Sequence, residues 1–169
     1  VEAGTLDIER ASVQLDRGRA DLKGKISGVG ALTSGKVTDF AALELPHQFH
    51  LVLTDMPVRS LAAAFVDPQV LPETVTATAT FEGKSFAPDE LVRAEVFASG
   101  IPAQLTRGIA TSARLETTAR IRAESASISA LRLRANGVEI EAKGEVPFSD
   151  AKTFDLDVVV RDRRATAHL

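Results

Sequence analysis

The stretch ISALRLRANGVEIEAKGEV, residues 128–146, decides the fold of this chain. Its central Asn136-Gly137 is the dipeptide that a two-residue type I′ turn prefers, because both central positions of that turn need a positive φ. Folding about this turn gives the cross-strand pairs Ala135–Val138, Leu133–Ile140 and Leu131–Ala142 on one face and Arg134–Glu139 and Arg132–Glu141 on the other. Each pair contributes about 0.2–1 kcal/mol, so the register is strongly specified. The stretch predicts a β-hairpin with one apolar and one charged face.

The same alternation of apolar and polar residues recurs along most of the chain. It is clear at residues 49–53, 75–81, 92–98 and 154–160, and it is longest at residues 109–124, a run of about 16 residues against a typical strand of about 5–6. Three segments, ADLKG, ATFEG and IEAKG, also end at Gly24, Gly83 and Gly144 and suggest a weak repeat. The pattern predicts roughly ten strands, mostly in an antiparallel meander.

Proline interrupts the alternation at two places. After Met56-Pro57, apolar residues fall at helical spacing from Val58 to Phe65, and Ile101-Pro102 repeats the break before Leu105. We therefore expect one or two short helices between strands.

Large aromatic residues are scarce, since the chain has eight Phe and no Trp or Tyr. A β-sandwich normally anchors its core with such residues, whereas Ala, Val, Leu and Ile line a smooth surface more readily than they fill a thick core. The expected fold is all-β, a long meander curled into an open groove (a β-taco) with a hydrophobic concave face. The alternative is that this face packs on a second sheet in a closed sandwich.

Composition limits the possible partners and the setting. The net charge is −3, with 20 basic and 23 acidic residues interleaved, so no basic footprint for nucleic acid is present. No apolar run approaches the ~18 residues of a membrane span, and the absence of cysteine excludes disulfides and thiolate metal sites. Because the chain starts at Val1 in strand-like sequence, we expect residues 1–169 to be one segment of a much longer polypeptide.

Residues for catalysis are not evident. His47 and His50 stand three apart beside a strand, which directs their rings to opposite faces, so we interpret them as surface histidines rather than a metal pair. Gly28-x-Gly30 resembles the start of a dinucleotide fingerprint, but Thr33 occupies the third glycine position. No nucleophile elbow or phosphate-binding loop is found. We expect no enzyme activity, no metal and no cofactor.

An open apolar face could be covered by acyl chains. Burying a methylene group contributes about 0.8 kcal/mol, so a chain of ~16 carbons would gain on the order of 12 kcal/mol before ordering costs. This gain is enough to hold lipid without recognition of its head group.

Several segments resemble a known family. The segments VTATATFEG, FAPDELVRAEV and LRLRANGVEIEAKGEV, interrupted by TDMPVRSLAAAF, are similar to the repeating β-segments of TamB (translocation and assembly module) and AsmA-like proteins. The aliphatic-Pro-x-x-x-Leu break of that family corresponds here to Met56, Pro57 and Leu61, and the closing Gly-x-Val to Gly144, Glu145 and Val146.

The resemblance implies a function and a setting. Such proteins are anchored in the inner membrane of Gram-negative bacteria, span the periplasm, and take part in phospholipid transport to the outer membrane. With the barrel partner TamA, TamB also takes part in assembly of outer-membrane proteins. The family has no catalytic residues, and the lipid-binding groove face implied here consists of Val75, Ala77, Ala79, Phe81, Leu115, Ile121, Leu131, Leu133, Val138, Ile140, Leu156 and Val158.

Other functions compete with a lipid groove. The apolar face or an unpaired edge strand could act like a chaperone and bind β-strands of outer-membrane proteins by augmentation. The chain could also be a structural β-sandwich spacer with a sealed core and no ligand.

Overall fold

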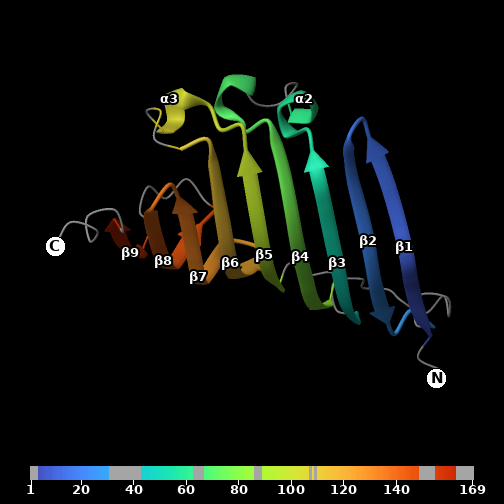
Figure 1. Ribbon diagram of the computed structural model, residues 1–169. Helices are drawn as coiled ribbons and strands as arrows, with labels where there is room; N and C mark the ends of the chain where they lie inside the picture. Colours follow the sequence, from blue (N-terminus) through green and yellow to red (C-terminus); the bar gives the residue numbers. More distant parts are fainter. Residues whose placement is uncertain are drawn as a thin grey trace.

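The structure is a computed structural model that describes residues 4–30, 43–62, 67–85, 89–106, 108, 110–148 and 155–162. The described residues form one sheet whose nine strands lie side by side in chain order (Figure 1). The strands are β1 (Thr5–Leu15), β2 (Gly18–Ser27), β3 (Glu44–Met56), β4 (Thr74–Ser85), β5 (Asp89–Ser99), β6 (Ser112–Arg122), β7 (Ser125–Ala135), β8 (Val138–Pro147) and β9 (Asp155–Asp162).

Every neighbouring pair of strands is antiparallel, and the sheet is open. Within the described residues β1 pairs only with β2, and β9 pairs only with β8, so the sheet has two free edges. The prediction of an all-β antiparallel meander that stays open is confirmed, with nine strands instead of roughly ten. A sandwich of two packed sheets is not formed by the described residues.

The hairpin of residues 128–146 has the predicted register. Asn136 and Gly137 have φ values of 45° and 83°, as a type I′ turn requires. All the cross-strand pairs expected from the sequence are present between β7 and β8. A bulge at Ser129 and Ala130 lies beyond them, and it places Ile128 on the same face as Leu131 although they are three residues apart.

Both proline breaks lead into short helices at one end of the sheet (Figure 1). The helix α2 (Val58–Ala62) and the 3₁₀ helix η1 (Pro68–Val70) connect β3 to β4, and α3 (Ala103–Thr106) lies between β5 and β6. The guanidinium of Arg59 joins the two connections, because its Nη2 donates to Leu71 O at 3.1 Å and to Gly100 O at 2.8 Å. The predicted helical breaks are thus confirmed.

The long alternating run is shorter as a strand than the sequence suggests. Of the described residues 110–124, only the 11 residues of β6 are in the sheet, and the longest strand described is β3 with 13 residues. Thr111 O accepts a hydrogen bond from Ile101 N at 3.0 Å, so the backbone before β6 closes the preceding connection. Phe65 and Phe154, expected in a helix and in the last strand, lie outside the described residues.

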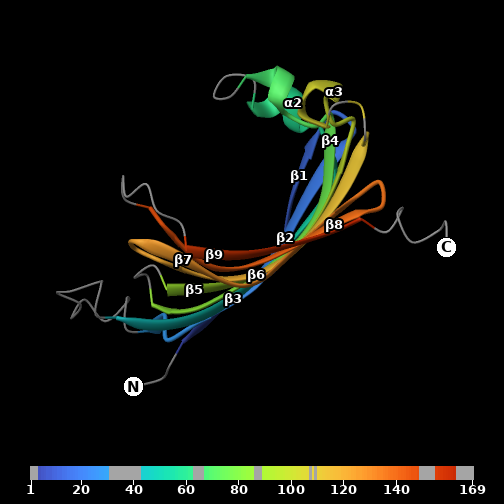
Figure 2. The same cartoon turned by 90° about the vertical axis from the view of Figure 1, so that its left-hand side faces the viewer.

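The strand register sorts side chains onto two faces. We call the apolar face the one that carries Leu133 and Ile140, and the polar face the one that carries Arg132 and Glu141. Few apolar residues are buried, and among the described ones these are Leu45, Met56, Ala77 and Ala110, of which only Leu45 is fully buried. The sheet is strongly curved when it is seen edge-on (Figure 2). The described residues therefore form a single curved layer with little enclosed core.

The repeat glycines lie on the apolar face where a neighbour needs their space. A Cβ on Gly24 would overlap the Phe49 ring, and one on Gly83 would come within 2.6 Å of His47. At Gly144 the φ is 142°, and a Cβ would overlap the backbone oxygen of Asp155. These glycines belong to β2, β4 and β8, so their similar spacing in sequence corresponds to different numbers of strands.

We predict that Gly144→Ala destabilises the sheet more than Gly108→Ala does. Both glycines have a positive φ, which costs an L-residue about 1–3 kcal/mol, but a Cβ on Gly108 meets no atom within 4 Å. The larger loss of stability expected for Gly144→Ala comes from the close approach of β8 and β9 at this glycine. Urea unfolding followed by circular dichroism measures both, and equal losses for the two variants would contradict this packing.

Candidate functional site: two faces of one sheet

The groove residues implied by the family resemblance come together on one face. The strand register pairs Phe81 with Val92, Leu115 with Leu133, and Ile140 with Val160. The alternation of side chains along each strand places the other groove residues on the same face. All of the predicted groove residues lie on the apolar face, in β4, β6, β7, β8 and β9. The same face continues through β1, β2, β3 and β5, which contribute Leu6, Ile8, Val13, Ala20, Leu22, Phe49, Leu51, Leu53, Val92, Ala94 and Val96.

Most of this face is only partly covered. Leu133, Ile140 and Leu115 are half-buried by their neighbours in the sheet, and Val158 and Val160 are exposed. The connection at Pro57 covers one end, since a Cβ on Gly18 would meet Pro57 Cδ at 2.7 Å. No second layer of strands lies over the apolar face among the described residues. The face is available to an apolar ligand over most of its extent.

Ion pairs cross the polar face from strand to strand. A series of these ion pairs links neighbouring strands from β5 to β9, and we call it the charge ladder. Its members are Glu95, Arg114, Glu116, Arg132, Glu141 and Arg161. The Arg132–Glu141 pair is 2.9 Å long and the Arg161–Glu141 pair 2.5 Å, so Glu141 of β8 joins β7 and β9. Glu139 lies beside the ladder with only 4% of its side chain exposed, and it contacts Arg132, Arg134 and Arg161.

These contacts shift the pKa values of carboxyl groups on this face. Hydrogen bonds from Arg132 and then Arg161 lower the pKa of Glu141, and a hydrogen bond from Arg120 lowers the pKa of Asp89. At the other end of the sheet, a hydrogen bond from the Ser12 hydroxyl lowers the pKa of Asp21. The polar face is therefore held by ionised carboxylates at neutral pH.

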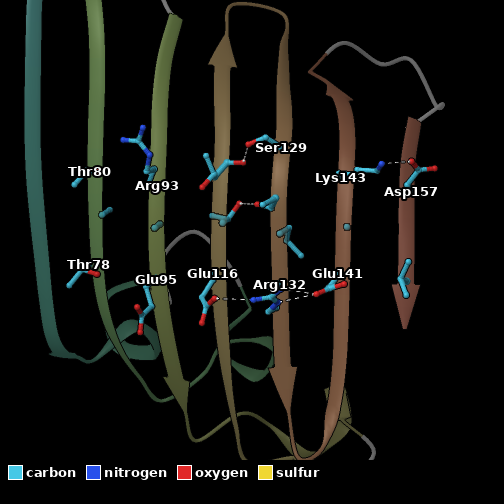
Figure 3. Close-up of a pocket in the computed structure, with 18 of the residues that line it drawn as sticks. Thr78, Thr80, Arg93, Glu95, Glu116, Ser129, Arg132, Glu141, Lys143 and Asp157 are labelled. Carbon is cyan, nitrogen blue, oxygen red and sulfur yellow. Dashed lines mark hydrogen bonds and ion pairs between the residues drawn. The ribbon is translucent and has the colours of Figure 1, made fainter. Parts of the chain in front are cut away.

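A hollow of about 650 Å³ lies over β3 to β9. The side chains that Figure 3 labels around it include Arg93, Glu116, Arg132, Lys143 and Asp157, which belong to the polar face. Several of them are already paired, as with Lys143 and Asp157 at 3.5 Å. Most of its lining residues belong to the face opposite the predicted groove, but Ala79 and Leu131 of the predicted groove also line it. The prediction that the concave face is hydrophobic therefore stays a prediction.

His47 and His50 point to opposite faces of β3, as their spacing predicted, but His47 is not a surface residue. Only 9% of its side chain is exposed, and its Nε2 lies 2.8 Å from Glu90 Oε1 over Gly83. Its Nδ1 is 2.9 Å from Leu45 O, which can only accept, so Nδ1 is the donor of this hydrogen bond. The pair is a polar contact within an apolar face.

Two kinds of site are not found in the described part of the chain. No group of three or more His, Asp or Glu residues there is arranged to hold a metal ion. None of the helices described is long and apolar enough to cross a membrane.

Comparisons with protein-family models, with curated proteins and with solved structures each gave no match.

We predict that Glu141 stabilises the folded state above its unfolded pKa, near 4.5, because its pKa is lowered in the sheet. This stabilisation is lost as the pH falls through the folded pKa. Glu141→Gln should therefore be less stable than the parent at pH 7, and the two stabilities should converge as the pH is lowered below 4.5. Urea unfolding over this pH range measures the effect.

Glu145→Gln, on the same strand and face, controls for the general loss of a negative charge on β8. A constant difference between Glu141→Gln and the parent at every pH would show that the charge ladder does not act through ionised Glu141.

Proposed function

We propose that this chain is a lipid-binding segment of a periplasm-spanning protein, anchored in the inner membrane, for phospholipid transport to the outer membrane and assembly of proteins there. The observation that carries the proposal is the apolar face, which extends over nine strands and has no second layer on it among the described residues. A surface of this size in contact with water is costly, and a covering ligand or partner would remove that cost.

Acyl chains suit this face chemically. Its side chains are mostly Val, Leu, Ile and Ala, which offer dispersion contacts and no fixed polar partner. Each buried methylene contributes about 0.8 kcal/mol, so affinity can arise along the length of an alkyl chain. A row of such residues across successive strands would let a chain move along the sheet without breaking a specific contact.

The polar face is a poorer candidate for lipid. Its hollow is lined by threonine and alanine residues together with arginine, lysine and carboxylate groups, and several of these charged groups already pair across strands, as Arg132 does with Glu141 and Lys143 with Asp157. An acyl chain there would bury these charges without giving them new partners, which costs free energy. We therefore assign acyl chains to the apolar face.

The setting and the partner in this proposal come from the TamB and AsmA-like resemblance. Of the residues that carry this resemblance, Met56-Pro57 begins the connection to α2, and Gly144 lies at the β8–β9 contact. An outer-membrane β-barrel similar to TamA is the protein partner that this resemblance suggests.

A second candidate function is favoured by the free edges of the sheet. An extended strand of an outer-membrane protein could add to β1 or β9 through backbone hydrogen bonds, as in β-augmentation. In this function the edge of the sheet would bind the backbone of the added strand, and every second side chain of that strand would lie on the apolar face.

We predict that phospholipid co-purifies with the chain and is lost when a charge is placed on the apolar face. Leu133→Asp, and Ile121→Asp at a more exposed position, should each lower bound lipid at least about tenfold, because a carboxylate there disfavours an acyl chain. Native mass spectrometry with lipid extraction from the same sample measures this.

Thr118→Asp is the matched control for Ile121→Asp. It adds the same charge to the same strand on the polar face, opposite Arg93, and should keep its lipid. Equal lipid content in the Ile121→Asp and Thr118→Asp variants, both folded by circular dichroism, would refute the assignment of lipid to the apolar face.

A further inference from the structure

The guanidinium of Arg59 in α2 is held in place by backbone carbonyl groups. Its Nε and Nη2 donate to Leu71 O at 3.3 and 3.1 Å, and Nη2 also donates to Gly100 O at 2.8 Å. Its Nη1 forms no hydrogen bond with the described residues. The side chain is half-buried, so one side of the guanidinium is fixed and the other still has N–H groups to donate.

The positive charge of Arg59 has no carboxylate partner among the described residues. The two connections, residues 57–73 and 100–111, contain only Asp67 and Glu73 as acidic residues in their whole sequence. Asp67 Oδ1 accepts a hydrogen bond from Gln69 N at 2.9 Å, and the exposed Glu73 lies beside Gly100. A half-buried guanidinium without a counterion is a favourable partner for an anion.

A hollow of about 440 Å³ lies at Arg59 between the two connections. The other described residues that line it are Pro68, Gln69, Pro102 and Gln104. Each glutamine amide can donate hydrogen bonds, and none of these lining residues is acidic. The helices α2 and α3 of the two connections lie at the same end of the sheet in both views (Figures 1 and 2). The hollow thus offers an anion one cation and neutral donors.

From this arrangement we propose that Arg59 is the centre of a phosphate-binding site, and that it binds the phosphodiester of a phospholipid whose acyl chain lies on the apolar face. The planar guanidinium fork suits phosphate oxygens, which accept two parallel hydrogen bonds. The inference rests on the proposed lipid function and adds a position for the head group.

The apolar face continues from this end of the sheet along β4 and β5. Val75 pairs with Ala98 next to the connections, and the pairs Ala77–Val96, Ala79–Ala94 and Phe81–Val92 follow. This strip is about 20 Å long at about 3.3 Å per residue. It ends at Gly83, over which His47 contacts Glu90 at 2.8 Å. An acyl chain on the strip would therefore run from the cation at Arg59 toward this polar contact.

Two lipids with the same acyl chain test the site. Palmitoyl lysophosphatidylglycerol carries a phosphodiester, and monopalmitoylglycerol carries none. In isothermal titration calorimetry with the lipid-free chain, below the micelle concentration of each lipid, the parent should bind the phosphodiester lipid at least about tenfold more tightly. Arg59→Gln should abolish this preference and keep the affinity for monopalmitoylglycerol, which also shows that the variant is folded.

Arg17→Gln is the matched control, because Arg17 lies in the β1–β2 turn at the same end of the sheet and also has no ion pair with the described residues. It removes the same charge and should keep the preference. Gln104→Glu is a second test that leaves Arg59 in place. Gln104 is exposed, so the fold should tolerate the change, while a carboxylate in the hollow should lower affinity for the phosphodiester lipid alone.

The outcomes separate this inference from the lipid function. Equal affinity of the parent for the two lipids, or an unchanged preference in Arg59→Gln, would overturn the phosphate site and leave lipid binding intact. Binding of neither lipid would overturn both. Inorganic phosphate alone should not bind at about 10 mM, because it lacks the acyl chain. Binding of inorganic phosphate that is lost in Arg59→Gln, without a gain from the acyl chain, would assign the site to free phosphate and overturn its link to lipid.

Discussion

The fold depends on cross-strand matching of side chains by kind. Most strand positions on one face are apolar and most on the other are polar or charged, and neighbouring strands bring these positions into register, with exceptions such as Phe97 opposite Arg114. The contacts of Leu133 with Ile140 and of Arg132 with Glu141 show this on opposite faces of one hairpin. Because the described sheet is a single layer, its stability comes from such pairs between neighbours, since little side-chain surface is enclosed in a core.

This constraint explains the position of the glycines and of the charges. Gly24 gives space to the ring of Phe49 on the apolar face, and Gly144 lets β9 approach β8. On the polar face the charge ladder links neighbouring strands from β5 to β9, on which no second layer packs among the described residues. Exposed ion pairs contribute little one by one, but the shared partners of Glu139 and Glu141 form a network across β7, β8 and β9.

The parts of the fold that local sequence controls could be predicted. The register of β7 and β8 followed from Asn136-Gly137 and the residues beside it, because a tight turn leaves no freedom in pairing. The ends of the strands at Pro57 and Pro102 followed from the loss of a strand donor at proline, and the helix after Pro57 followed from the helical spacing of Val58 and Leu61. The bulge at Ser129 and Ala130 could not, since it depends on both neighbours of β7.

The site was predicted in part for the same reason. The apolar residues were assigned to one face because alternation with period two requires it. The contact of His47 with Glu90 joins residues that are far apart in sequence, so no local pattern predicts it. The only hint in the sequence is Gly83, because a glycine there leaves room for the His47 ring. The link from Arg59 to Gly100 and the hollow on the polar face arise from tertiary placement, which no local pattern encodes.

The central claim is that acyl chains bind the apolar face of a single-layer sheet. Photo-cross-linking with a phospholipid that carries a diazirine on its acyl chain, followed by peptide mass spectrometry, tests it most directly. The account predicts adducts at apolar-face positions such as Leu115, Leu133 and Ile140. Adducts confined to the residues that line the polar hollow, such as Glu116 and Lys143, would contradict it.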